Sequence, residues 1–409
     1  MRRFSIFTVW VSLCLCFAMP AMAKVHVGGL VTLDASYQRW DSDGALNQSA
    51  GEPRGSDDWQ QLGIVVPDHT RLNGRWENVY MNLGLFLELG LGSSASGSFI
   101  YLRNAYGWYK INSMFKLIAG QTYGSFSTMN PAQFLVLGAD WTPDSSAGDI
   151  EFANFEEDWL PQLRLETRFN DMITWKIAAV DNRAAHTFFG LAGNEENAWP
   201  RIDSMLSLKF DRVYVESGFS WSKGKRDEGG QNPGAETSFD VFAFVLGFKF
   251  RFDVGPFFLA GKGMYGRAFA DRGAGLAAFI YSGFDVLGPE YFVRLSLEDS
   301  QDIAFGLKAG FRFGHHSSIN LLYGYQNTEG VLTWFDGEDW QSAEQEWTRH
   351  VVGITAPIIL ARIFIITPRL LLYDWGNYEL DEDLNVLMGL EDVKLGREIV
   401  GGVSFTVVF

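Results

Sequence analysis

Apolar and polar residues alternate through most of the chain, and the alternation is clearest between positions 302 and 313. Apolar side chains occupy every odd position from Ile303 to Phe313, while Lys308 and Arg312 stand at even positions. Successive side chains of a β-strand point to opposite faces, so a period of two is typical of strands. The pattern therefore predicts strands with one apolar face and one polar face.

Segments of this kind recur along the chain, and we expect sixteen of them. They lie at residues 25–37, 71–76, 79–89, 99–109, 115–126, 160–169, 173–180, 202–210, 213–221, 239–251, 256–269, 303–313, 319–326, 347–360, 363–373 and 395–409. Tight turns, the first at Glu77-Asn78, alternate with long loops such as 38–69. An even strand number with this asymmetry is typical of outer-membrane barrels. We interpret residues 275–297 as a loop, although one more hairpin there would give eighteen strands.

The composition supports a strand-built membrane protein. After residue 23 no apolar run is long enough for a helical span, because the closest, at 357–366, is interrupted by Arg362. The 34 Phe, 14 Trp, 14 Tyr and 44 Gly suit a barrel that is apolar outside and polar inside. The predicted fold class is all-β, a transmembrane antiparallel β-barrel. A large soluble all-β protein is the alternative.

The first 23 residues have the features of a signal peptide. Arg2 and Arg3 precede a short apolar core at 4–17, and Ala21-Met22-Ala23 forms a small-x-small cleavage site. We therefore expect a signal peptide at 1–23 and a single barrel domain at 24–409. Cleavage would remove both cysteines and change the formal net charge from −16 to −18, because Arg2 and Arg3 leave with the segment. Such acidity argues against a nucleic-acid partner.

The same alternation sorts charged residues between lipid and lumen. A cation near the bilayer midplane costs about 2–4 kcal/mol on the lipid face, so the apolar parity must point outwards. The polar parity then faces the lumen, and the cations on it are the predicted pore lining. They are Arg71, Arg75, Arg103, Arg164, Arg168, Lys176, Lys209, Lys249, Lys262, Lys308, Arg312, Arg349 and Arg369. The expected inward acids are Asp34, Glu88, Glu166, Asp203, Glu216 and Glu398. Ion pairs that only hold the loops down are the alternative role for these cations.

The insertion at 127–159 is long for a hairpin connection. Its apolar residues, among them Phe134 and Trp141, give it enough surface to pack, and we expect it to fold inwards as loop 3 and narrow the pore. Asp140, Asp149 and Glu151 on this loop would then face the basic wall and create a transverse field. A surface loop is the alternative.

Three stretches carry a family resemblance, namely Arg103-Asn104-Ala105-Tyr106, Ala119-Gly120-Gln121-Thr122-Tyr123 and Pro161-Gln162-Leu163-Arg164. In this order they resemble the DcaP-like trimeric outer-membrane porins, which belong to the broader sixteen-stranded bacterial porins, and the resemblance covers residues 97–169. It implies a homotrimer, small anionic solutes such as dicarboxylates, and a constriction near Arg103, Arg164 and Arg168. The sequence departs from the family's usual His at Asn104 and its usual Trp at Tyr123.

The final segment ends in an aromatic residue, Phe409, on an alternating strand. This ending resembles the C-terminal signature of bacterial outer-membrane barrels, which implies recognition by the insertion machinery and a location in the cell outer membrane. The expected function is a porin, a passive diffusion channel for small hydrophilic solutes that favours small anions. We expect no enzyme activity, cofactor or metal, because the six histidines stand outside any G-x-S-x-G or zinc-binding motif. A lipase- or protease-type barrel and a structural or adhesive barrel are the alternative functions.

Overall fold

A computed structural model describes most of the chain. The described residues are 23–41, 59–65, 70–94, 97–122, 160–181, 200–227, 238–267, 292–313, 317–335, 340–360, 363–374, 376–380, 393–394 and 396–409. The predicted signal peptide, apart from Ala23, and the whole of loop 3 lie outside these ranges. Within them, no helix is long and apolar enough to cross a membrane.

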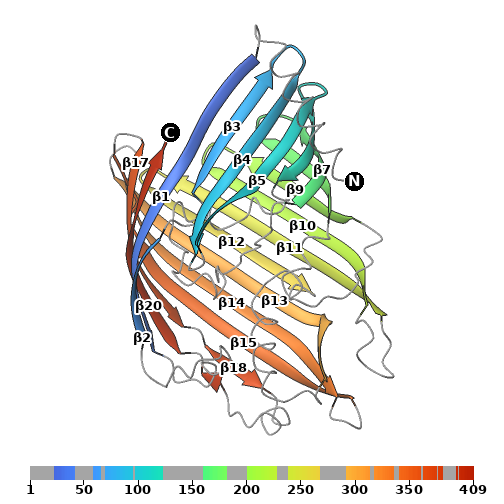
Figure 1. The fold of residues 1–409 in the computed structure, drawn as a ribbon, viewed down its shortest axis with the longest axis vertical. Helices are drawn as coiled ribbons and strands as arrows, with labels where there is room; N and C mark the ends of the chain where they lie inside the picture. Colours follow the sequence, from blue (N-terminus) through green and yellow to red (C-terminus); the bar gives the residue numbers. More distant parts are fainter. Residues whose placement is uncertain are drawn as a thin grey trace.

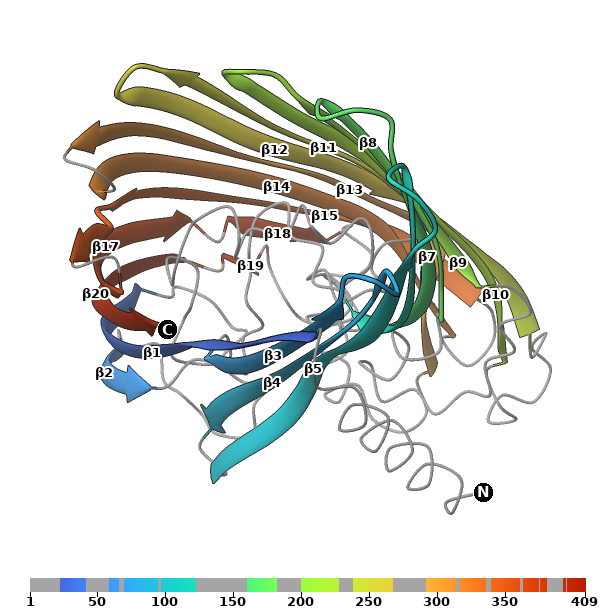
Figure 2. The same cartoon turned by 90° about the horizontal axis from the view of Figure 1, so that it is seen from above.

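Secondary structure in the described part consists of strands. They are β1 (Ala23–Asp41), β2 (Trp59–Val65), β3 (Arg71–Asn78), β4 (Leu83–Ser94), β5 (Gly97–Lys110), β6 (Phe115–Thr122), β7 (Leu160–Arg168), β8 (Ile173–Val180), β9 (Arg201–Lys209), β10 (Val213–Asp227), β11 (Ser238–Val254), β12 (Phe257–Arg267), β13 (Phe292–Phe313), β14 (Ser317–Phe335), β15 (Trp340–Thr355), β16 (Ile358–Leu360), β17 (Phe364–Asp374), β18 (Asn377–Leu380), β19 (Val393–Lys394) and β20 (Arg397–Val408). They form one antiparallel sheet that curves round into a barrel (Figures 1 and 2).

The barrel is closed by sixteen strands. The ring runs through β1, β3 to β15 in sequence order, β17 and β20, and it closes where β20 pairs with β1. The shorter segments β2, β16 and β18 pair with the ends of the ring strands β1, β17 and β15, and β19 pairs with β18. The prediction of a sixteen-stranded transmembrane barrel is thus confirmed. The eighteen-strand alternative fails because β12 pairs directly with β13.

Three predicted boundaries were wrong. The long loop expected at 38–69 contains the end of β1 and all of β2, and residues 292–297 belong to β13 instead of a loop. The turn expected at Glu77-Asn78 lies instead between β3 and β4 at residues 79–82. The first two errors share a cause, since antiparallel hydrogen bonding continues for several residues beyond the point where apolar alternation ends. In the third, the apolar residues Val79, Tyr80 and Met81 lie in the turn and not at the start of the next strand.

Short hairpin turns gather at one end of the barrel, which we call the turn end (Figure 1). Three of these turns use the same device, in which an asparagine side chain accepts hydrogen bonds from two backbone N–H groups ahead of it. Asn78, Asn112 and Asn170 each make such a pair, at 2.8 to 3.1 Å. The side chain replaces a backbone acceptor and fixes the direction of the chain as it reverses.

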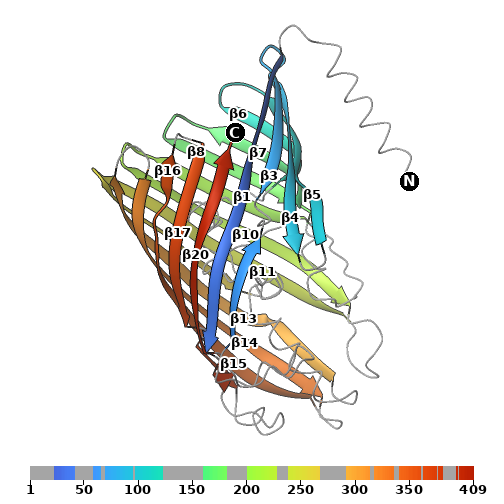
Figure 3. The ribbon, with the colours of Figure 1, turned by 60° about the vertical axis from the view of Figure 1, so that its left-hand side comes forward.

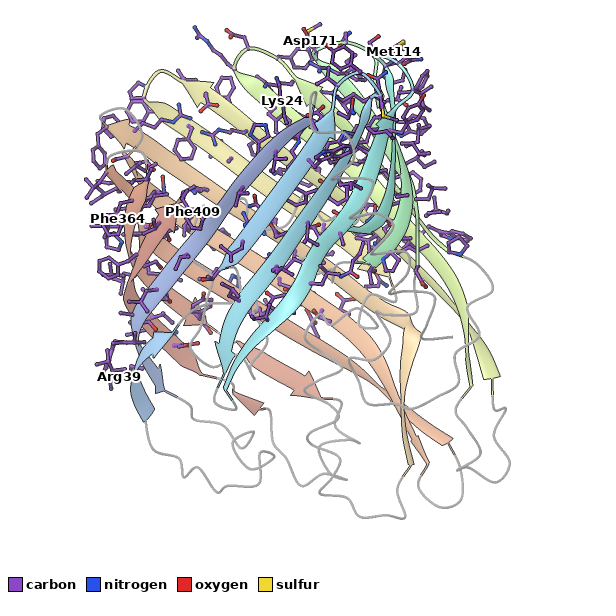
Figure 4. All side chains as sticks on the ribbon, turned by 45° about the horizontal axis from the view of Figure 1, so that its top comes forward. Lys24, Arg39, Met114, Asp171, Phe364 and Phe409 are labelled. Atoms are coloured by element: carbon purple, nitrogen blue, oxygen red, sulfur yellow. The ribbon has the colours of Figure 1, made fainter. Side chains whose placement is uncertain are left out.

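The outer face of the barrel is apolar and exposed. Many large hydrophobic side chains on the outward parity, among them Leu246, Phe248 and Leu307, are more than one-third exposed. Side chains around Phe364 project from the outer edge of the barrel in Figure 4. In a closed antiparallel barrel the inter-strand ladders pair the backbone N–H and C=O groups, and the apolar exterior presents hydrocarbon to lipid.

Candidate pore lining

The two faces of the wall are distinguished at the seam where β17, β20 and β1 lie side by side (Figure 3). Arg369 of β17 and Asp34 of β1 are not on neighbouring strands, yet Arg369 Nη1 donates to Asp34 Oδ1 at 2.8 Å across Ser404 of β20. Side chains converge in this way on the concave face of a curved sheet. The parity of Asp34, Ser404 and Arg369 is therefore the inner one.

Registers propagate this assignment round the ring. All thirteen predicted strand cations fall on the inner face, namely Arg71, Arg75, Arg103, Arg164, Arg168, Lys176, Lys209, Lys249, Lys262, Lys308, Arg312, Arg349 and Arg369. The six predicted acids share it: Asp34, Glu88, Glu166, Asp203, Glu216 and Glu398. Asp140, Asp149 and Glu151 lie outside the described residues.

Two inner-face ion pairs are deeply buried and join one cation to one acid. In the seam, the side chains of Arg369 and Asp34 are 0% and 1% exposed, and Ser404 Oγ donates to the same carboxylate at 2.6 Å. On β9, Arg201 Nε and Nη2 donate to both oxygens of Asp203, at 2.8 and 2.9 Å. In such closed pairs each charge neutralises the other, so they leave little charge for a passing solute, and removing one partner would leave the other buried without its counter-charge.

Arg103 lies at a β-bulge. The register between β4 and β5 shifts after Glu88, so Arg103 and Asn104 are both directed inwards although they are consecutive. Arg103 Nε and Asn104 Nδ2 donate to the same oxygen of Glu88, at 3.2 and 2.8 Å. The carboxylate also pairs with Arg71 at 3.5 Å, so it holds three wall residues together.

Arg164 belongs to a second group on β6 and β7. Its Nε lies 3.7 Å from Glu166, and Lys116 Nζ donates to the other oxygen of Glu166 at 3.1 Å. Arg168 lies nearer the turn end and pairs with Asp171 of the β7–β8 turn at 2.7 Å. The three arginines linked by resemblance to the constriction are therefore spread along the wall over β5 and β7. Arg349 donates to Gln326 at 2.5 Å on another part of the wall.

A cluster around Trp108, which we call the Trp108 cluster, lies close to the turn end. It comprises Glu77, Arg75, Lys110 and Trp108 itself. Glu77 accepts from Arg75 Nη2 at 2.9 Å and from Lys110 Nζ at 2.8 Å, so one carboxylate serves two cations. The Arg75 guanidinium lies 5.0 Å from the centre of the Trp108 ring. The ring lies against Gly84, where an added Cβ would come within 1.9 Å of it.

A second cluster, the Phe258 cluster, has the same construction. Asp253 pairs with Arg251 Nε at 3.1 Å and with Arg312, so one carboxylate again serves two cations. The two guanidinium groups lie 4.8 and 5.0 Å from the centre of the Phe258 ring, and Lys308 Nζ lies 6.0 Å from it. The ring lies against Gly310, where an added Cβ would be 2.2 Å away.

The alternation of the sequence predicted Arg75, Lys308 and Arg312 on the inner face but not their partners in these clusters. Glu77 was expected in a turn, and Asp253, Lys110 and Arg251 were not among the expected inward residues. A signal was present, since each acid stands two residues from an arginine and therefore on the same strand face. No group of three or more metal-ligating side chains occurs in the ranges that the structure describes.

The fold and this wall define a class of protein. A closed sixteen-stranded antiparallel barrel with an apolar exterior and a charged inner face has the porin fold and points to the cell outer membrane.

Solved structures agree on the fold. The outer membrane channel DcaP of Acinetobacter baumannii is 14% identical, with a TM-score of 0.56, over 96% of this chain and 99% of that one. An anion-selective porin from Comamonas acidovorans gives the same identity and TM-score over 95% of this chain and 100% of that one. The outer membrane protein OmpT of Vibrio cholerae in its trimer form is 11% identical, with a TM-score of 0.51, over 95% and 100%. No family model and no curated protein matches the sequence.

Proposed function

We propose that the protein is a passive diffusion channel of the outer membrane for small hydrophilic solutes, and that it favours small anions such as dicarboxylates. The observation that carries this proposal is the charge of the inner face. On the described strands cations outnumber acids there, and in the Trp108 and Phe258 clusters two cations share a single carboxylate.

A basic wall in a narrow aqueous passage raises the local concentration of anions and lowers that of cations. The protein as a whole is acidic, at a formal net charge of −16, so the preference comes from where charges lie and not from their sum. The buried pairs at Asp34 and Asp203 contribute little to it, because each of these acids neutralises an arginine.

Three finer features belong to the same proposal. Dicarboxylates are suggested by the resemblance described above, and the solved relatives include a porin named as anion-selective. A homotrimer is suggested by the same resemblance and by the trimer form of OmpT. Loop 3, at 127–159, would narrow the passage and oppose Asp140, Asp149 and Glu151 to the basic wall. On the described strands, no observation favours the enzymatic or adhesive alternative.

The test is the reversal potential of the purified protein in planar bilayers under a potassium chloride gradient. We expect a potential of the sign that indicates anion preference, and a larger preference when succinate replaces part of the chloride. A strong cation preference would contradict the proposal. Lipid hydrolysis that disappears with a single Ser or His substitution would instead support an enzyme.

Replacing Arg103, Arg164 and Arg168 together by Gln should move the reversal potential towards cation selectivity. The matched control replaces Arg39, Arg212 and Arg397, which lie on the outer parity or in a turn, and removes the same charge from outside the lumen. Equal shifts in the two triple variants would remove the three wall arginines from the solute path.

A further inference from the structure

The Phe258 cluster differs from the buried ion pairs in how its charges are balanced. Within the residues that the structure describes, the carboxylate of Asp253 forms ion pairs with both Arg251 and Arg312. The side chains of Arg251 and Arg312 are 42% and 35% exposed, whereas the pair of Arg369 and Asp34 in the seam is almost fully covered. One positive charge is therefore left over at a place that solvent reaches.

The aromatic ring determines how the two guanidinium groups can bind. The two guanidinium carbons lie 4.8 and 5.0 Å from the centre of the Phe258 ring, within about the 6 Å range of cation–π contact, and such a contact leaves N–H donors of the guanidinium groups available to a further acceptor. The N–H donors lie along the edges of the guanidinium planes, and a planar carboxylate matches that fork. Asp253 already shows that a carboxylate fits between Arg251 and Arg312, and it occupies only part of their ten N–H donors, at about five per guanidinium.

The Trp108 cluster repeats the arrangement on another wall. Both clusters lie next to short hairpin turns, since Lys110 ends β5 and Asp253 stands one residue before the end of β11. In the ring, β5 and β12 are separated by six strands on one side and eight on the other, so the clusters face each other across the barrel. Two independent groups of one acid, two cations and one aromatic ring at the same end argue for a shared role.

We propose that Arg251 and Arg312, held by Asp253 and Phe258, form a carboxylate-binding station at the turn end of the pore. The Trp108 cluster is its counterpart on the facing wall. The station is distinct from Arg103 and Arg164, which lie on β5 and β7. The proposed station rests on the proposed channel function, because the solute must be able to enter the lumen. It specifies small carboxylates as the solutes and gives them a binding step near this mouth.

The experiment measures block of single-channel current by succinate, added in turn to each side of the bilayer. For the wild type we expect a lower half-blocking concentration on one side. In the Arg312→Gln variant, that concentration should rise about tenfold on that side, which corresponds to about 1.4 kcal/mol. Arg251→Lys keeps the charge but loses the fork, and should give a smaller rise. Phe258→Leu should raise the concentration roughly threefold, because the guanidinium groups lose the surface that orders them.

The matched control is Arg212→Gln, which removes one charge from a neighbouring turn at the same end. We expect it to leave succinate block unchanged. The proposed station would be contradicted if Arg212→Gln and Arg312→Gln raised the half-blocking concentration of succinate equally, or if Arg312→Gln left it unchanged. The reversal potential separates the two proposals. If the wild-type channel shows no anion preference but its half-blocking concentration for succinate still depends on Arg312, the proposed anion selectivity is contradicted and the carboxylate-binding station is not. A selective channel whose block is indifferent to Arg312 contradicts the station alone.

Discussion

Glycine residues on neighbouring strands leave the space in which two inner aromatic rings pack against the barrel wall. Trp108 covers Gly84, and Phe258 covers Gly310, and in each case the neighbouring strand offers no Cβ to hold the ring away from the wall. A flat ring leaves its face open to arginine side chains, which is the geometry that both clusters use. The positions of Gly84 and Gly310 therefore determine where the arginine side chains of the two clusters can lie.

Gly84→Ala should destabilise the barrel by about 1–3 kcal/mol, because the new methyl group must displace the Trp108 ring. Gly74 on the adjacent strand provides the control, since an added Cβ there meets nothing within 4 Å. Gly74→Ala should be neutral or stabilising by about 0.4–1 kcal/mol. Urea unfolding from lipid vesicles, followed by tryptophan fluorescence, measures both free energies of unfolding. Equal values would show that the ring adapts without cost.

At the scale of strands, the period of two was sufficient to predict the ring. It located all sixteen strands and placed Lys308 and Arg369 on the inner parity, because a strand buried in lipid on one face cannot shift by one residue. It did not predict the bulge at Arg103 and Asn104, where two successive side chains share a face. Nor did it predict which cations share an acid, because partners such as Arg251 and Arg312 lie on different strands and meet only through register.

The seam provides the prediction at this scale. Asp34→Asn should lower the free energy of unfolding by about 3–5 kcal/mol, since it leaves the guanidinium of Arg369 buried without its counter-charge. Asp171→Asn is the control, because Asp171 is 93% exposed and its pair with Arg168 lies in a turn. That change should stay within about 0.5 kcal/mol. Vesicle-based urea titrations compare the two variants, and similar midpoints would contradict a stabilising role for the seam pair.

For the whole molecule, the membrane imposes a band of apolar side chains on the exterior. Leu307 lies near the middle of the outward apolar row from Ile303 to Phe313 on β13, and Phe313 lies at the turn end of the same row. We therefore expect a charged side chain to cost more free energy at Leu307 than at Phe313, although both positions lie on the same face of the same strand.

Leu307→Arg should cost about 2–4 kcal/mol, whereas Phe313→Arg should cost about 0–1 kcal/mol, because the penalty for a cation falls towards the interface. Folding yield into vesicles and urea midpoints measure the difference. A penalty at Phe313 as large as that at Leu307 would mean that the turn end lies deeper in the bilayer than the turns suggest.

The closing contact between β20 and β1 also constrains the order of assembly. Ser404 and Asp34 are 370 residues apart in sequence, whereas most other ladders join strands that follow one another in sequence. Hairpins can form successively as the chain becomes available, but this last ladder must wait for both ends and carries the highest contact order in the ring. Until then β1 and β20 each present one edge without a partner strand. Contacts that form after the rate-limiting step slow unfolding without speeding folding, so we expect the seam pair to slow the reopening of the barrel more than it speeds closure.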